Sequence, residues 1–549
     1  MFHRGRNSPG LRIGAAPLAV TLIVVLGLGP QSLRGSDLEA ERGIQLTGSI
    51  VRPDGKRVPS LVTVRNLSRG ITWTFLSSES GAFVLGGVPA GDYRVWIRSQ
   101  NLAEADFALP DLQADHHLEV EMKIGETPVA LPNADMLAYL PDEGQARQLL
   151  RFHCIQCHGL EFIVGAQKSA AEWQSTVQSM AARVPPTPDG QMEQIARYLA
   201  RHFGPENRTE VPTLGARRYA FEPGAVMVEI DLPEAAAHPH EMVLGPDGKL
   251  WVSDFDVRPN LLHNSLFRID PDTLQVETLK IPISATGARS IAFDGDGNPW
   301  VAILFGDVLA RLNPETGNAE AFQVPGKNIW PHTIVFDGQG QAWFTGMRSD
   351  SIGSLDPAKG VFQEFTVPTA RSMLFDLEAD DQGNLWYTGL FAHKLGKFNP
   401  RTHRFTEFPT PTPLSSTRYL TIGPRGDIWI ALFAAGKIAR FDRQTETFQE
   451  IALADPNSSP YDLLVTEKGF VWFTNFTRNS LGRLDPATGT VEEFSILSSP
   501  YARPTEIELG PSGKIWFCEN GMARVAYLDP TGLAEPGVYS FSADPYPGN

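Results

Sequence analysis

The sequence predicts a mainly β protein of several domains: a β-sandwich, a small α-helical domain and a seven-bladed β-propeller. Three observations predict this fold class. Tryptophan recurs every 43 to 49 residues through the second half of the chain, and short alternating strands fill the first part. Helical spacing of apolar residues is confined to a segment between them. At 549 residues the chain is long enough for about three or four domains.

Composition limits the partners of the chain. It contains 63 acidic and 47 basic residues, a net charge of -16, which argues against nucleic acid or an anionic membrane surface. The remaining candidates for a partner are a redox partner protein and a small-molecule substrate. With 42% hydrophobic and 20% charged residues a sizeable core is available, and three cysteines imply no disulfide framework.

The N-terminus carries an export pattern. Arg4, Arg6 and Arg12 precede an apolar run at 15–29, which is short for a membrane span. This pattern predicts a signal peptide at 1–36 and a periplasmic or secreted protein. The alternative is an N-terminal anchor that is never cleaved. No other stretch approaches membrane-spanning length.

Segment 44–124 alternates in strand-length runs between turn residues, as in the Pro53–Lys56 turn. Gly81 precedes Phe83 on one predicted strand, and Gly91 precedes Tyr93 on the next. This order resembles the carboxypeptidase regulatory-like domain. The resemblance implies an Ig-like β-sandwich without catalysis of its own.

Cys154, Cys157 and His158 form a Cys-x-x-Cys-His run, which is typical of a c-type haem attachment site. Two thiols at this spacing can form thioethers with one porphyrin, and His158 would be the proximal iron ligand. The alternatives are a redox-active pair or half of a zinc site. The helical flanks disfavour the first, and the distant position of the third cysteine, Cys518, disfavours the second. Thioether attachment takes place on the export side in bacteria, in agreement with the signal pattern.

The haem motif lies in a predicted small α-helical domain at 133–208, with helices at 144–152, 170–183 and 190–203. Trp173, Val177 and Met180 resemble the W-x3-V-x2-M helix of small class-I-type cytochrome c domains. The resemblance implies Met180 as the distal iron ligand. Met192 is the alternative, and either side chain could instead be core packing. A Met/His ligand pair suits electron transfer.

The segment 217–549 repeats a unit typical of one four-stranded propeller blade. The repeated tryptophans are Trp251, Trp300, Trp343, Trp386, Trp429, Trp472 and Trp516. Glycine stands three residues before each of them. Seven repeats predict seven blades. Two segments compete to close the ring, Met227–Leu232 and Gly537–Ser542.

The repeat resembles the streptogramin B lyase (virginiamycin B lyase) family, with matching pieces at Pro331–Ile334, Trp343–Thr345 and Leu481–Leu484. The resemblance implies a Mg²⁺-assisted elimination that opens an ester ring. The family positions for two histidines and two metal-binding glutamates hold Thr505, Tyr461, Arg503 and Glu519. Glu519 alone matches.

Residues equidistant from a hairpin turn are neighbours, so the residue eleven before each tryptophan should lie beside the one three after it. The first set is His240, Arg289, His332, Phe375, Arg418, Tyr461 and Thr505. Such side chains are also common on the wet rim of a propeller channel. A substitute catalytic or metal-binding cluster is expected where blades seven and one adjoin, from His238, His240, Asp254 and Glu519.

Three functions follow as hypotheses. The first is a periplasmic electron-transfer protein with covalent haem c, whose propeller binds a substrate or partner. The second is a lyase-like enzyme with Mg²⁺ at the propeller mouth. The third is a non-catalytic binding scaffold.

Overall fold

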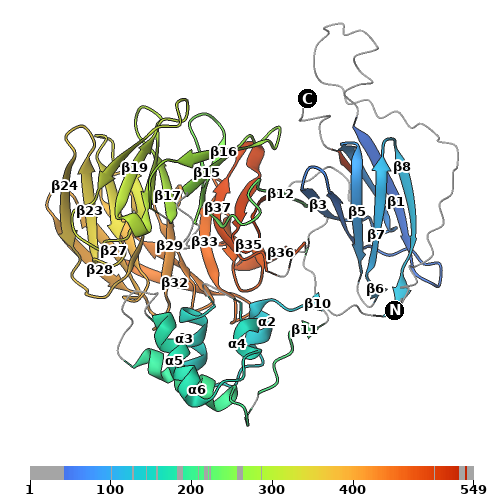
Figure 1. Cartoon of the computed structure of the whole chain (residues 1–549), viewed down its shortest axis with the longest axis horizontal. Coiled ribbons are helices and arrows are strands. Elements are labelled where there is room, and N and C mark those ends of the chain that lie inside the picture. Colours follow the sequence, from blue (N-terminus) through green and yellow to red (C-terminus); the bar gives the residue numbers. More distant parts are fainter. Residues whose placement is uncertain are drawn as a thin grey trace, which may run out of the picture.

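The computed structural model describes most of the chain after residue 42 (Figure 1). The described residues are 43–99, 102–125, 129–143, 145–155, 159–181, 190–207, 209–215, 221, 224–255, 264–285, 287–496, 498–499, 501–530 and 538–540. The predicted signal peptide, Cys157 and His158 lie outside them. None of the described helices has the length and apolar character needed to span a bilayer.

Residues 44–124 form two larger sheets that share a hydrophobic core. The strands are β1 (Ile44–Val51), β2 (Leu61–Asn66), β3 (Ile71–Leu76), β4 (Ala82–Val88), β5 (Gly91–Arg98), β6 (Leu102–Ala103), β7 (Ala105–Leu112), β8 (His116–Glu121) and β9 (Lys123–Ile124). One sheet has the order β4-β1-β8 and the other β3-β2-β5-β7, while β6 pairs with β9. Leu46 and Phe83 of the first sheet and Val64 and Val95 of the second belong to one buried cluster. The predicted Ig-like character of this region stays a prediction.

A group of short helices follows, between two strands that pair with each other, β10 (Val129–Ala130) and β11 (Leu214–Gly215). The helices are α2 (Asn133–Leu137), α3 (Ala146–His153), α4 (Glu161–Val164), α5 (Ala170–Ala181) and α6 (Gln191–His202). Ser169 and Glu172 form a capping box at the start of α5: Glu172 N donates to Ser169 Oγ, and Ser169 N donates to Glu172 Oε2. Trp173 and Val177 of α5 pack into the apolar cluster that holds these helices together.

The remaining strands form a β-propeller. Blade one contains β13 (Pro239–Leu244), β14 (Leu250–Asp254), β15 (Asn264–Ile269) and β16 (Val276–Ile281). Blade two contains β17 (Ala288–Phe293), β18 (Pro299–Ile303), β19 (Val308–Leu312) and β20 (Ala319–Gln323), with the 3₁₀ turn η1 (Leu304–Gly306). Blade three contains β21 (Pro331–Phe336), β22 (Ala342–Gly346), β23 (Ser351–Asp356) and β24 (Val361–Thr366). Blade four contains β25 (Leu374–Ala379), β26 (Leu385–Gly389), β27 (Lys394–Asn399) and β28 (Arg404–Pro409). Blade five contains β29 (Thr417–Ile422), β30 (Ile428–Leu432), β31 (Lys437–Asp442) and β32 (Thr447–Ala452). Blade six contains β33 (Pro460–Val465), β34 (Val471–Asn475), β35 (Ser480–Asp485) and β36 (Thr490–Ser495). The seventh contains β37 (Pro504–Leu509), β38 (Ile515–Glu519) and β39 (Arg524–Asp529), with the 3₁₀ turn η2 (Pro511–Gly513). The inner strand of each blade contacts the inner strand of the next blade, and β13 of blade one contacts β37 of blade seven, so the ring of blades is closed. The predicted mainly β fold with propeller blades is confirmed.

The Gly and Trp repeat has a local cause. The glycine before each tryptophan lies in the turn between the first two strands of a blade, and Gly297, for example, has a φ of 82°. That left-handed conformation favours glycine. The tryptophan then packs between blades. In three blades its indole NH also donates to an aspartate at the start of the turn, as from Trp300 to Asp294 at 3.0 Å.

Strand β12 (Val226–Asp231) closes the ring by pairing antiparallel with β39. Of the two competing segments, the earlier one therefore completes blade seven, while β40 (Val538–Ser540) pairs parallel with β4. The other edge of β12 pairs with β3, so that one eight-stranded sheet runs from the propeller into the N-terminal region (Figure 1). Asp231 at the end of β12 accepts hydrogen bonds from Arg524 of the propeller and Arg65 of the N-terminal sheet.

Candidate functional site

The innermost strand of every blade contains a β-bulge near the ring centre. In blade one Pro239 pairs with Asp254 and Met242 pairs with Val252, so the inner strand has one extra residue. The other six blades show the same shift. The predicted pairing is therefore wrong by one position: the residue twelve before each tryptophan, and not the one eleven before it, lies opposite the residue three after it.

The bulge places two successive residues of each inner strand at the ring centre. Hairpin counting missed the second set, which is Glu241, Ser290, Thr333, Asp376, Tyr419, Asp462 and Glu506. Four of these seven residues are acidic. The strands that carry them are otherwise mainly apolar, and this contrast is the sequence signal that identifies the set.

A buried network of polar side chains links blades one, five, six and seven. His240 Nδ1 on β13 lies 2.9 Å from Glu506 Oε1 on β37. On the other side of the imidazole, His240 Nε2 lies 2.9 Å from the hydroxyl of Tyr461 on β33. Tyr419 on β29 donates its hydroxyl proton to Glu506. These residues are at most 5% exposed, so water does not compete for their partners.

Two buried arginines lie beside this network. The Nε of Arg289 donates to His332 Nε2 at 2.7 Å, and its guanidinium group lies 5.2 Å from the ring centre of Phe255. The guanidinium group of Arg418 lies 4.1 Å from the ring centre of Tyr461 and contacts Phe433 in the same way. The two cations are thus packed against aromatic faces, which stabilise buried guanidinium groups.

Burial controls the protonation of the carboxyl groups at the centre. It raises the pKa of Glu241 to about 8, that of Asp462 to about 7 and that of Asp376 to about 6. It raises the pKa of Glu506 well above the ordinary carboxyl value, and the neighbouring Asp462 and Glu241 add to this effect. The centre therefore retains protons at pH values where exposed carboxyl groups have lost theirs.

The two histidines shift in the opposite direction. Burial, followed by the positive charge of Arg289, lowers the pKa of His240 and of His332 well below the ordinary imidazole value. Both imidazoles are neutral at pH 7. A neutral imidazole beside a carboxyl group can accept, donate or hold a proton, or bind a metal ion.

Helix α3 covers this centre. The guanidinium group of Arg151 enters the propeller and donates to Ser459 Oγ at 2.9 Å, to the carbonyl oxygens of Pro456 and Phe433 at 2.7 Å, and to the carbonyl oxygen of Ser458. The next residue, Phe152, packs into an apolar cluster with Phe433, Tyr419 and Tyr461. In Figure 1 the helices lie against the lower end of the propeller. The helix that leads to the Cys-x-x-Cys-His run is thus bonded to the residues around the ring centre.

The residues predicted to hold haem are described only in part. Cys154 is the C-cap residue of α3 and is partly buried against the helical cluster. Met180 on α5 is 41% exposed, whereas Met192 packs partly against the cluster. Cys157 and His158 lie outside the described residues.

The four predicted catalytic residues have three different surroundings. His240 belongs to the central network. His238 is exposed, and its backbone NH donates to the buried Asp254 at 2.8 Å, which fixes the loop before β13. Glu519 is fully buried, and its pKa is raised well above the ordinary value by burial and by the neighbouring Glu229.

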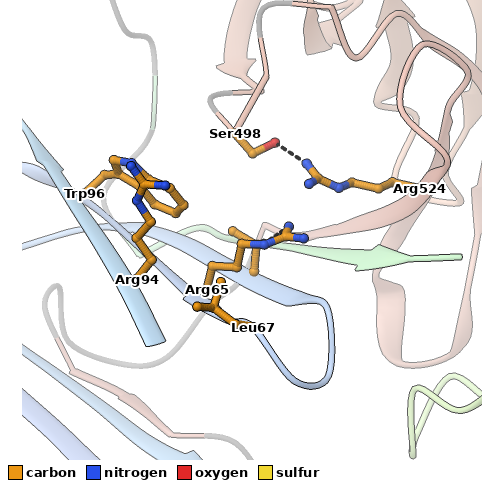
Figure 2. Close-up of a pocket in the computed structure, with 7 residues that line it drawn as sticks. Arg65, Leu67, Arg94, Trp96, Ser498 and Arg524 are labelled. Atoms are coloured by element: carbon orange, nitrogen blue, oxygen red, sulfur yellow. Dashed lines mark hydrogen bonds between the residues drawn. The ribbon is translucent and has the colours of Figure 1, made fainter. Parts of the chain in front are cut away.

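A recess lies between the N-terminal sheet and blade seven (Figure 2). This pocket of about 250 Å³ is lined by Arg65, Leu67, Thr72, Arg94, Trp96, Ser498 and Arg524. Its arginines already have carboxylate partners: Arg65 and Arg524 pair with Asp231, and Arg94 pairs with Asp106. The pocket is therefore a weaker candidate than the ring centre.

Comparison with known proteins identifies the propeller type. Residues 274–546 match the Virginiamycin B lyase family. A crystal structure of virginiamycin B lyase from Staphylococcus aureus superposes with a TM-score of 0.51 and 22% identity, covering 55% of this chain and 99% of the lyase. A streptogramin B lyase structure gives the same TM-score and identity, covering 56% and 99%.

The comparison with curated proteins gives no match. At 22% identity the structural similarity defines the fold and not the reaction. The chain carries a β-propeller similar to that of the virginiamycin B lyase family.

Proposed function

We propose that the chain is an exported electron-transfer protein with one covalent haem c, in which the propeller holds the haem-bearing helices and binds a substrate or partner. The observation that carries this proposal is the contact of α3 with the propeller. Arg151 donates to the loops that precede β33 and follow β30, and Phe152 packs in one cluster with Tyr419 and Tyr461. Cys154, the first residue of the haem motif, follows two residues after Phe152.

The described residues of the helical region fit such a group. Cys154 is partly accessible at the end of α3, as thioether formation requires. Phe162 and Met180 are 68% and 41% exposed, which is unusual for large apolar side chains. A haem on Cys154, Cys157 and His158 would supply apolar surface for them to cover, and Met180 would provide a sixth ligand. When bound, the haem supplies one-electron chemistry.

The residues at the ring centre would serve proton transfer and positioning. His240 is neutral and hydrogen-bonded to Tyr461 at Nε2, while Glu506 accepts a hydrogen bond from the Tyr419 hydroxyl. Oxidation of many organic substrates releases protons together with electrons, and within the buried His240–Glu506 pair the neutral imidazole can accept one of them through Nδ1. Helix α3 keeps bulk water away from this pair.

Covalent haem attachment is the test. The full chain is produced together with a c-type haem maturation system, and its mass is measured after denaturation. We expect one haem per chain, and we expect Cys154→Ser combined with Cys157→Ser to abolish it. The matched control is Cys518→Ala, a buried cysteine of β38, which should retain the haem. A wild-type chain without haem, or a double variant that keeps it covalently, would contradict the proposal.

A second candidate is acid–base catalysis of the lyase type, and the buried His240–Glu506 pair favours it. The family positions for the catalytic base and one metal ligand hold Thr505 and Arg503, so such a reaction would need a different set of residues. Turnover of a cyclic ester antibiotic, abolished by Glu506→Gln, would support this candidate. No turnover by the wild-type chain would eliminate it.

A further inference from the structure

Three side chains at the join between the first and last blades offer ligand atoms to one point. His240 and Glu241 on β13 and Glu506 on β37 each contribute one atom, and these atoms lie within 4.8 Å of one another. Ligands about 2.1 Å from a common cation are roughly 3–4.2 Å apart, so side-chain shifts below 1 Å, about the tolerance of rotamers, would complete the geometry. These three residues are not at the positions that carry the metal ligands and the base in the lyase family. Those positions are occupied by Arg503, Thr505 and Glu519 in this chain.

The Nδ1 atom of His240 has the environment of a metal-binding nitrogen. The side chain is 7% exposed, and Nδ1 makes no hydrogen bond to the described residues. Glu506 Oε1 is only 2.9 Å away but lies outside the direction needed for a hydrogen bond. Two ligands of one cation have this relation, because their lone pairs converge on the metal and not on each other.

Each of the three ligands has its own supporting hydrogen bond. The hydroxyl of Tyr461 lies 2.9 Å from His240 Nε2, and with the proton on Nε2 the lone pair of Nδ1 is directed to the site. Tyr419 donates to Glu506, and the hydroxyl of Ser290 donates to Glu241 at 3.2 Å. Partners of this kind orient metal ligands and are a regular part of metal sites.

The charge at the ring centre calls for a cation. Glu241, Asp376, Asp462 and Glu506 interact with one another, and the described cations that act on them are those of Arg289 and Arg418. Ionisation of all four carboxyl groups against two guanidinium groups would leave two negative charges in a buried space. Such an excess is costly unless protons or a divalent cation neutralise it.

We propose that His240, Glu241 and Glu506 bind a divalent transition-metal cation at the centre of the propeller. One imidazole with two carboxylates favours Mn²⁺ or Fe²⁺ over Mg²⁺ and Ca²⁺, which prefer oxygen ligands alone. The site lies among the side chains that Phe152 of α3 covers. The inference stands independently of the haem.

The probe is Mn²⁺ alone, because thiolates such as those of the Cys-x-x-Cys-His run prefer softer metals. The full chain is stripped with a chelator, dialysed and titrated by calorimetry, and the bound Mn²⁺ is examined by pulsed electron paramagnetic resonance. We expect one Mn²⁺ per chain and a ¹⁴N coupling from a single imidazole. Glu506→Gln should weaken binding by at least about tenfold, and Tyr461→Phe by about tenfold.

The matched control is Glu508→Gln. Glu508 lies on the same strand, and burial raises its pKa to about 7, but it is not one of the three ligands. This variant should bind Mn²⁺ within about twofold of wild type, because Glu508 contributes no ligand atom. The proposal is overturned if the wild-type chain binds no Mn²⁺ at up to about 1 mM, if its Mn²⁺ signal lacks the nitrogen coupling, or if Glu506→Gln binds as tightly as Glu508→Gln. The wild-type spectrum decides the matter even if a variant fails to fold.

Discussion

The propeller contains two buried groups of carboxyl side chains, and their charges are balanced in different ways. At the ring closure, Glu229 and Glu519 are fully buried beside Arg524. Arg524 donates to Asp231 at 2.6 Å and lies 3.8 Å from Glu229. This group joins β12 to β39, and its cation pairs directly with Asp231 and Glu229.

At the ring centre the cations are directed to other groups. Arg289 donates to His332, and Arg418 lies over Tyr461 and Phe433. Glu241 and Glu506 are bonded to hydroxyl groups. The same residue types therefore have two roles: a paired group stabilises the closure of a ring, and an unbalanced group is available for a proton or a metal.

The largest expected effect is at the closure. Arg524→Ala leaves buried carboxylates without their cation and should lower the free energy of unfolding by about 3–5 kcal/mol, measured by denaturant titration. The control, Arg268→Ala, removes a pair with the half-exposed Glu277 and should cost about 1 kcal/mol or less. Equal losses in the two variants would mean that the closure group is no more than a surface pair.

The contact of α3 with the propeller comes next. Arg151→Ala removes four hydrogen bonds from a buried guanidinium group, and we expect a loss of about 2–3 kcal/mol. Hydrogen exchange should become faster in α3. Arg147→Ala, which removes one bond of 3.3 Å to Asn457, should change little. Unchanged exchange in the Arg151 variant would show that α3 is held by other contacts.

The protonation of the centre predicts an unusual pH dependence. Above about pH 7.5 the histidines are neutral in both states, and the unfolded carboxyl groups are ionised. Folded Glu241, with a pKa of about 8, and folded Glu506 still hold protons. The folded state therefore binds more protons, and stability should fall by roughly 1–2 kcal/mol as the pH rises through this range.

Calorimetric melting in the presence of a chelator measures this fall, and Mn²⁺ should remove it by replacing the protons. Glu241→Gln should make the chelator curve flatter. A melting temperature that rises with pH in the chelator would contradict the assigned protonation.

The smallest effect belongs to Asp231→Asn. This carboxylate is 34% exposed and accepts bonds from Arg65 and Arg524. Because solvent screens it, the loss should be about 1 kcal/mol or less in the same denaturant titration. A loss as large as that of Arg524→Ala would mean that Asp231 is the main partner of the closure group.

The fold could be predicted largely because the repeat has local causes. A left-handed glycine and an indole that packs between blades are required in each repeat, so that Gly297 and Trp300 recur as a pattern. The predicted helix at 170–183 likewise corresponds to α5, because Ser169 and Glu172 cap its start.

The site depended on features without a local signal. One extra residue in each inner strand moved Glu241 and Glu506 to the centre, and hairpin counting assumes that no such residue exists. Arg151 and Phe152 have ordinary helical spacing, and their partners lie about 300 residues later in the chain. The choice of β12 as the closing strand was equally non-local, since β3 and β39 lie far from it in sequence.

The most direct test of the proposed electron-transfer role is the absorption spectrum of the matured full chain, oxidised and reduced, before and after addition of CO. A low-spin reduced spectrum that CO leaves unchanged is expected, because Met180 would occupy the sixth position of the iron. Met180→Ala should then bind CO, and Met192→Ala should not. A wild-type chain without a haem spectrum, or one whose reduced haem binds CO at once, would contradict an electron carrier.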